Sequence, residues 1–189
     1  GVRCGKIAVV CRDISLYRAA VRYEFRMAEI PLYCDEPTTP EFSAPATAVR
    51  ALLALLRGAD MTEQLTVLAK TGLCDLTEPE VCALENYAYT WSPNAAAWRA
   101  EFTKSPRGFG DAELTEEDTQ NLTRAENARK KLVTAVDTLR GKVRSANAEQ
   151  ISRALYFCLK ELGAEGQQAA QVEDIRTARG IPAAEEAAR

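Results

Sequence analysis

The stretch TEEDTQNLTRAENARKKLVTAVDTLRGKVR, residues 115–144, decides the fold class of this chain. Thr115 can cap a helix, and Asp118 belongs to an acidic first turn that suits the positive end of a helix dipole. Apolar side chains then recur at three- and four-residue steps, the spacing of one helical face. These apolar residues are Leu122, Ala125, Leu132, Val136, Leu139 and Val143. The stretch predicts one long amphipathic helix.

Shorter helices are predicted on both sides of it. Apolar residues at helical spacing indicate two helices that end at Gly58 and Gly72, the second of them capped by Thr62. The sequence TEPE, residues 77–80, combines a capping box with an early proline and predicts a third helix. Asn147 can cap a further helix after the long one. This part of the chain is therefore expected to be almost wholly helical.

The chain divides into segments of different character. Residues 1–35 have a βα pattern, and the proline-rich residues 36–45 cannot form a regular helix. Residues 46–165 are expected to form a helical domain in which residues 92–114, rich in glycine and proline, are irregular. Residues 166–189 are a polar helical tail, with Gly163 and Gly166 expected to break the preceding helix. The predicted fold class is mainly α, with a partial βα segment before the helical domain.

The βα segment begins with the apolar run IAVV, residues 7–10, which is typical of a buried strand. Asp13 can cap the helix that follows, and Ile30-Pro31 ends it because proline disfavours helical geometry in the residue before it. No second strand of equal quality follows, so the strand is expected to have an unsatisfied edge. The chain also starts at Gly1 and ends in a helix-forming tail, which favours a piece of a longer polypeptide.

Composition argues against several classes of site. The 189 residues carry a net charge of -3, no histidine, and six cysteines without a C-x-x-C pair, so a zinc site is not expected. No glycine-rich loop ends in lysine and a hydroxyl residue, so a phosphate-binding loop is absent from the sequence. The carboxylates between residues 111 and 118 lead into a helix start and are explained by capping. We expect no catalytic, cofactor or metal residues, and reduced thiols in a cytoplasmic protein without a membrane span.

Two groups of cations are candidates for contact with DNA. Seven basic and two acidic side chains give residues 124–144 a local charge of +5. The basic residues are Arg124, Arg129, Lys130, Lys131, Arg140, Lys142 and Arg144. Such a helix face can pair with phosphates, but it can equally be a solvated face or the usual bias of cations toward a helix C-terminus.

The second group is Arg99, Lys104 and Arg107 beside four aromatic residues, which are Trp91, Trp98, Phe102 and Phe109. Aromatic rings among cations can stack nucleic-acid bases. They also commonly form the small core of a loop. Both interpretations stay open at the level of the sequence.

The order of these motifs resembles a known family. Strand, polar turn, helix and the exit IPLY resemble the start of the second RecA-like lobe of UvrD-type helicases, most closely the AddB (RexB) component of AddAB-type helicase–nucleases. Four later blocks strengthen the resemblance: residues 52–56, 69–73, 83–87 and 98–99. The resemblance implies an internal fragment of such a protein, in which residues 46–165 are the helical insertion called 2B.

The resemblance also implies a function for the longer protein. That function is ATP-dependent unwinding and degradation of DNA at double-strand breaks, together with the A subunit. ATP, magnesium and an iron–sulfur cluster belong to other parts of such proteins. The positions where active motors carry an arginine and a glutamate are Ala19 and Arg22 here, while Arg18 and Glu24 are displaced from them. We therefore expect this fragment to be a non-catalytic scaffold that contacts DNA. The alternative is a helical protein–protein interaction module without a nucleic-acid role.

Overall fold

The computed structural model describes residues 3–34, 43–110 and 113–179. It divides into two compact units, Gly1–Pro40 and Glu41–Arg189. The described residues are mainly helical and contain no strand. The predicted connection, residues 36–45, lies mostly outside the described residues, but its last part is already helical because helix α2 begins at Ala44.

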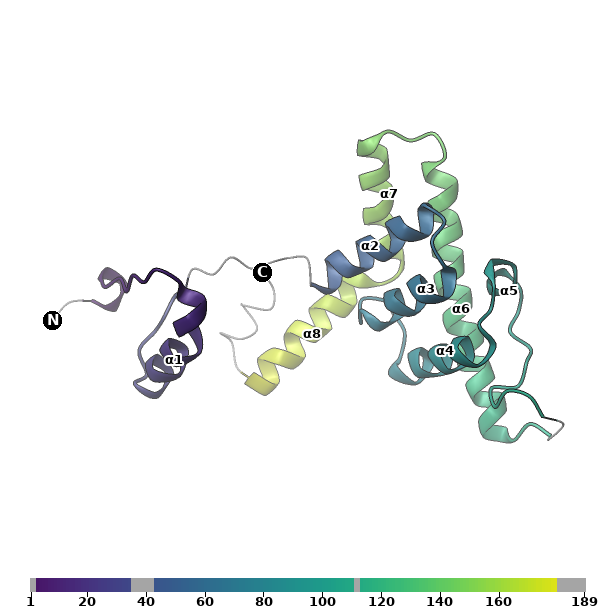
Figure 1. The fold of residues 1–189 in the computed structure, drawn as a ribbon, viewed down its shortest axis with the longest axis horizontal. Helices are drawn as coiled ribbons and strands as arrows, with labels where there is room; N and C mark the ends of the chain where they lie inside the picture. Colours follow the sequence, from purple (N-terminus) through teal and green to yellow (C-terminus); the bar gives the residue numbers. More distant parts are fainter. Residues whose placement is uncertain (1–2, 35–42, 111–112, 180–189) are drawn as a thin grey trace. The chain divides into compact units, whose positions relative to one another are not determined.

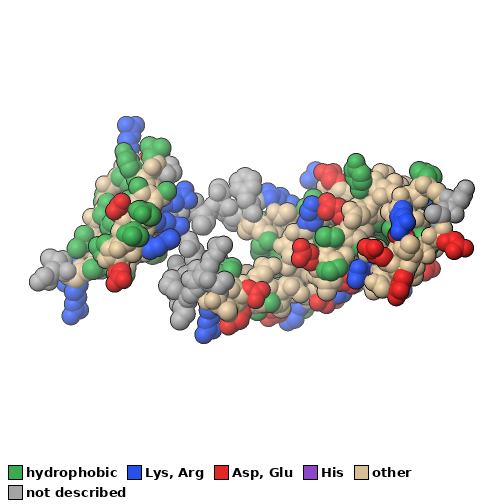
Figure 2. All heavy atoms as spheres, turned by 90° about the horizontal axis from the view of Figure 1, so that it is seen from below, with side chains coloured by type: hydrophobic (Ala, Val, Ile, Leu, Met, Phe, Trp, Pro, Cys, Tyr) green, Lys and Arg blue, Asp and Glu red, His purple; other side chains and the backbone are tan. Residues whose placement is uncertain are grey.

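The smaller unit contains a short 3₁₀ helix, Cys4–Lys6, and helix α1, Ile14–Met27. Helix α1 begins directly after Asp13 and ends before Ile30-Pro31, as the sequence predicts. The strand predicted over residues 7–10 is not formed. A strand needs a neighbouring strand to satisfy its backbone groups, and the described residues supply none. No described residue of this unit is buried, and Figure 2 shows hydrophobic side chains across its surface.

The larger unit is built around its longest helix, α6, Glu116–Val143. The other helices are α2 (Ala44–Leu56), α3 (Met61–Lys70), α4 (Glu78–Trp91), α5 (Ala95–Arg99), α7 (Ala148–Glu161) and α8 (Ala164–Arg179). Helices α4 and α7 make the most extensive contacts with α6, and α2 and α5 also touch it. In Figure 1, α7 folds back beside the C-terminal half of α6, and α4 lies against the opposite half.

Local capping explains where these helices begin. Thr77 with Glu80, and Thr115 with Asp118, form the capping boxes that start α4 and α6. Asn147 caps α7, as predicted. The predicted cap of α3 is wrong by two residues, because the side chain of Asp60 accepts the N–H of Glu63 at 2.9 Å. The predicted cap, Thr62, is instead a hydrogen-bonding partner of the loop after α4, as described below.

The core of the larger unit is formed by leucines and one tryptophan. The largest fully buried side chains are Trp98, Leu52, Leu55, Leu65, Leu68, Leu84, Leu132, Leu139, Leu162 and Val136. They come from each of the helices α2 to α6 and from the residue just after α7. The apolar face predicted for α6 is thus the face that the other helices cover.

Two helices differ from the sequence prediction. Helix α5, Ala95–Arg99, lies within the region expected to be irregular, where Asn94 caps it through the N–H groups of two alanines. Helix α8 continues through Gly166, so the predicted boundary at residue 165 falls inside a helix. The break predicted at Gly163 is present, and this residue has a positive φ of 95°. Helix α8 packs on α7, and the Gln171 side chain donates to the Gly72 carbonyl at 2.9 Å.

Candidate nucleic-acid interface

The buried member of the predicted basic group is Arg129, which is only 6% exposed. Its guanidinium makes a bidentate contact with Glu126, at 2.5 and 2.6 Å, and donates to the Trp98 carbonyl at 2.8 Å. It also lies over the Phe102 ring, 5.5 Å from the centroid. Arg129 therefore joins α6 to the end of α5 and does not lie on an exposed basic face.

Electrostatics favour the charged form of this pair. Burial alone would raise the pKa of Glu126, but hydrogen bonds from the Arg129 guanidinium and the Phe102 N–H outweigh it, so the pKa is lowered. The hydrogen bond to Glu126 raises the pKa of Arg129. Both groups are ionised at neutral pH, and their ion pair replaces the hydration that each charge loses on burial.

Other cations of α6 are paired with acids far away in the sequence. Lys131 binds the carboxylate of Asp75 at 2.7 Å and contacts the backbone carbonyl of the same residue. The hydrogen bond from Lys131 lowers the pKa of Asp75. Lys142 lies 3.5 Å from Glu161 on α7. These contacts tie α6 to the α3–α4 connection and to α7.

Asp137 is shared by two of the predicted residues. Arg99 donates to both of its carboxylate oxygens, at 3.0 and 3.1 Å, and Arg140 donates to one at 3.1 Å. Arg140 also donates to the Leu55 carbonyl at the end of α2 at 3.0 Å. This three-residue cluster holds α5 and α2 against α6, and it keeps a net positive charge because one carboxylate faces two guanidinium groups.

Lys130 of α6 and its C-cap residue Arg144 have no hydrogen bond or ion pair among the described residues, although the charge of Lys130 still acts on Glu126. Lys130 and Arg144 are fourteen positions apart, which corresponds to about 21 Å along a helix and about 40° around it. The helix continues through Gly141, so both lie near one side. Between them the exposed residues of α6 are Thr134, Thr138, Gly141 and Lys142, and Lys142 is paired with Glu161. Arg124, the remaining member, donates to Asn121 at 3.1 Å.

Figure 2 shows acidic and basic side chains interspersed over the visible face of the larger unit. Within the positive run, the cations Arg129, Lys131, Arg140 and Lys142 are each paired with an acid. DNA contact by the predicted residues stays a prediction.

Two aromatic residues of the second group, Trp98 and Phe102, form a small core with Tyr87 beside the loop between α5 and α6. The rings of Tyr87 and Phe102 are stacked with centroids 4.0 Å apart, and Trp98 lies 5.4 Å from Phe102. The Trp98 indole N–H donates to the Thr62 hydroxyl at 2.9 Å, which donates in turn to the Pro93 carbonyl at 3.0 Å. The rings of Tyr87, Trp98 and Phe102 are buried and not available to stack on bases.

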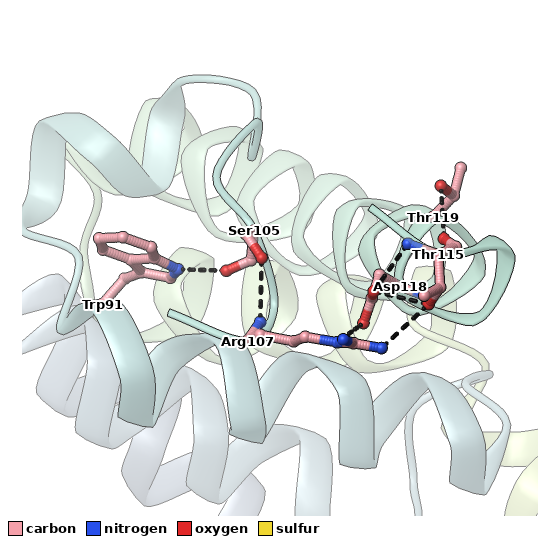
Figure 3. Close-up of polar contacts among 6 residues, drawn as sticks. All are labelled: Trp91, Ser105, Arg107, Thr115, Asp118 and Thr119. Carbon is pink, nitrogen blue, oxygen red and sulfur yellow. Dashed lines mark hydrogen bonds and ion pairs between the residues drawn. The ribbon is translucent and has the colours of Figure 1, made fainter. Parts of the chain in front are cut away.

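The remaining cations of this group stabilise the same loop, as Figure 3 shows for Arg107. Its guanidinium donates to Asp118 at 2.7 Å and to the Thr115 hydroxyl at 3.2 Å. Hydrogen bonds from the Thr115 hydroxyl and N–H, then from Arg107, lower the pKa of Asp118. Lys104 lies over the Trp91 ring, 4.4 Å from its centroid.

A groove between α2, α3 and α4 was not predicted from the sequence. It has a volume of about 660 Å³ and is lined mainly by apolar and threonine side chains, with Lys70 and Glu85 paired at its edge. Tyr89, 88% exposed, stands at this groove. The sequence signal for it is weak, since Tyr89 occupies an ordinary position on an amphipathic helix. In the described part of the chain, no three His, Cys, Asp or Glu side chains are grouped to hold a metal ion.

Distant sequence similarity connects the chain with helicase–nucleases, while no family model matches it. It is 24% identical over 186 residues to the B subunit of the ATP-dependent helicase/deoxyribonuclease of Alkaliphilus metalliredigens, covering 93% of this chain and 16% of that protein. It is 27% identical over 137 residues to the protein of the same name from Clostridium perfringens strain ATCC 13124, covering 69% of this chain and 12% of that protein. The chain thus spans less than a fifth of the relatives it matches.

These similarities place the chain in the context of a helicase–nuclease. Both relatives are named as one lettered component of an enzyme, which implies a complex with another component. Across the described ranges, no helix has the length and apolar character needed to cross a membrane.

Proposed function

We propose that this chain is a non-catalytic, helical scaffold segment of the AddB component of an AddAB-type ATP-dependent helicase–nuclease. The similarity to a relative of that kind over 93% of the chain carries the proposal. The larger unit corresponds to the helical 2B insertion, and the smaller one to the start of the second RecA-like lobe. The complex would act in repair of DNA double-strand breaks and in recombination.

The arrangement of charges supports a scaffold role. Ion pairs of α6 reach Asp75 before α4 and Glu161 on α7, so charged side chains join helices within the unit. The exposed apolar side chains of the smaller unit, such as Val10 and Leu16, fit a segment completed by further strands and helices of a longer protein.

The chemistry of the longer protein is assigned to other segments. This chain has no phosphate-binding loop, and Ala19 occupies the position of the motor arginine. Its described residues do not group as metal ligands. The proposal places ATP, magnesium and the iron–sulfur cluster of such proteins in other segments, and it assigns no catalytic step to this chain.

DNA contact by this segment is assigned to Lys130 and Arg144. Their exposure, their shared side of α6 and their lack of a polar partner among the described residues fit two phosphate contacts. Uncharged hydroxyl side chains between them, on Thr134 and Thr138, are also common partners of phosphate oxygens.

The test compares two double variants in binding to a duplex–single-strand junction at several salt concentrations. Replacing Lys130 and Arg144 by glutamine should remove two phosphate contacts and reduce the slope of log K against log salt by about 1.8. The control replaces Arg153 and Lys160, exposed cations of α7, and should leave the slope unchanged. If the wild-type chain binds without salt dependence, or if both variants behave alike, DNA contact through α6 is wrong. The helical interaction module would then be the better description.

A further inference from the structure

The loop between α5 and α6 leaves one aromatic ring in solvent. Phe109 is 93% exposed, and its ring meets Trp91 at an angle of 61° with the two centroids 4.7 Å apart. Between Tyr89 and Leu114, no other large hydrophobic side chain of the described residues is exposed. Glycines precede and follow Phe109 in the sequence, so neither neighbour has a side chain that could cover its ring.

A cation lies beside this aromatic pair. The Lys104 ammonium is 4.4 Å from the centroid of the Trp91 ring, which itself contacts Phe109. The Lys104 side chain is exposed and has no hydrogen bond or ion pair among the described residues. A cation–π contact at an exposed site is weak, so the ammonium can exchange part of it for an anion.

Hydrogen bonds hold the loop that carries the ring and the cation. The Trp91 indole N–H donates to the Ser105 carbonyl at 2.9 Å, and the Lys104 N–H donates to the Tyr87 hydroxyl at 3.3 Å. The Arg107 side chain attaches the loop to the first turn of α6, as Figure 3 shows. The loop is therefore fixed to α4 and to α6, which lowers the entropy lost when a ligand binds.

A hollow of about 350 Å³ adjoins the cation, and both Lys104 and Trp91 line it. The lining also includes Thr103, and hydroxyl groups are common partners of phosphate and sugar oxygens. Glu101 is the acidic residue of the lining, and its charge acts on the buried Arg129 guanidinium. Lys104 is thus the cation of this hollow that is available to a phosphate.

We infer that Phe109 and Lys104 form a stacking site for one unpaired base of a single-stranded nucleic acid. The base lies on the phenyl ring, and the ammonium binds an adjacent phosphate. The bases of a duplex are already stacked on one another, so the ring can accept a base only from a single strand. An aromatic platform beside a cation is the usual composition of sites that bind single strands without sequence preference. The inference deepens the proposed function, on which the choice of DNA rests.

The size of the exposed patch decides between a nucleic acid and a protein. A stable protein–protein interface buries about 800 Å² on each partner. One phenyl ring beside Trp91 is much smaller than that, whereas a single base needs only one ring face. The unpaired charge next to the pair is positive, which attracts phosphates. A single strand is therefore the occupant that the surface fits.

The experiment measures binding of the full 189-residue chain to a labelled oligothymidine and to an abasic strand of the same length, which keeps the phosphates and lacks the bases. The wild-type chain should bind the oligothymidine about fivefold or more tightly, because stacking of a base on an aromatic ring contributes at least about that factor. Phe109→Leu keeps an apolar side chain without a π face and should bind both strands alike, while Phe109→Trp should retain the preference. Lys104→Gln should keep the preference and reduce the slope of log K against log salt by about 0.7.

The matched control is Tyr89→Leu, because this ring is 88% exposed but lies at the groove between α2, α3 and α4. It should leave the preference for bases unchanged, and Phe109→Leu should leave the melting temperature unchanged. A wild-type chain that binds both strands alike, or neither at low salt, overturns the stacking site, as do equal effects of the two leucine variants. If Phe109→Leu weakens association with the complementary subunit and not with the oligothymidine, the ring is a protein contact instead. The double variant of Lys130 and Arg144 tests junction binding through α6 independently, so the two failures are distinguishable.

Discussion

Replacing Arg129 by methionine should destabilise the larger unit strongly. The change keeps a long side chain over Phe102 but removes the partner of Glu126 and the donor to the Trp98 carbonyl. A carboxylate that is mostly buried and a backbone oxygen would then lose the hydrogen bonds that Arg129 donates to them. The perturbation is thus a test of whether Arg129 has a structural role or belongs to a DNA-binding face.

The magnitude follows from the burial of the pair. Removing one partner of a buried ion pair costs about 3–5 kcal/mol. The Glu126 side chain is 15% exposed and keeps its hydrogen bond from the Phe102 N–H, so the lower end of this range of free energies applies. We expect a loss of about 3 kcal/mol, which lowers the melting temperature of a unit of this size by roughly 6–12 °C.

The assay is urea and thermal unfolding followed by circular dichroism, with Lys130→Met as the matched control on the next residue. That exposed position should change stability by less than about 0.5 kcal/mol. Adding Glu126→Gln to the Arg129 variant should recover part of the loss, because no unpaired carboxylate remains. A loss below about 1 kcal/mol for Arg129→Met, or equal effects at both positions, would refute this reasoning.

Two further predictions concern backbone conformation and acid sensitivity. Gly163→Ala should destabilise the fold by about 2 kcal/mol or more in urea unfolding, because φ is 95° and a Cβ would lie 2.7 Å from the Cβ of Asp75. Gly141→Ala, in an open position inside α6, should instead stabilise it by up to about 1 kcal/mol. The fold lowers the pKa values of Asp118 and Glu126, so these two carboxylates stabilise it at pH values above their ordinary pKa values of 3.8 and 4.5. That stabilisation is lost as the pH falls through the lowered values. Tryptophan fluorescence should therefore report release of the loop before α6 below about pH 4.5, and unchanged fluorescence down to about pH 2 would contradict this.

Local features of the sequence predicted most of the helical unit correctly. The capping boxes at Thr77 and Thr115 and the cap at Asn147 lie where α4, α6 and α7 begin. Each depends on residues three positions apart, so the sequence contains all the partners. The misplaced cap of α3 has the same kind of cause, because Asp60 and Thr62 are both capable caps and Thr62 is taken by the distant Trp98 and Pro93.

Features that depend on distant partners could not be predicted in the same way. Lys131 pairs with Asp75, 56 residues earlier, and Arg99 pairs with Asp137, 38 residues later. Counting charges along α6 includes Lys131 but omits Asp75, and it includes Asp137 but omits Arg99. The strand predicted over residues 7–10 is not formed. An apolar run indicates a strand only where a neighbouring strand is available to pair with it.

The distribution of partners therefore separates structural charges from charges available for binding. A cation whose guanidinium or ammonium group is held by an acid within the unit must give up that contact before it can bind phosphate, so it contributes little to DNA affinity. Lys130 and Arg144 have no hydrogen bond or ion pair to give up among the described residues. The proposed DNA contact should therefore depend on these two cations more than on the cations that are paired with acids inside the unit.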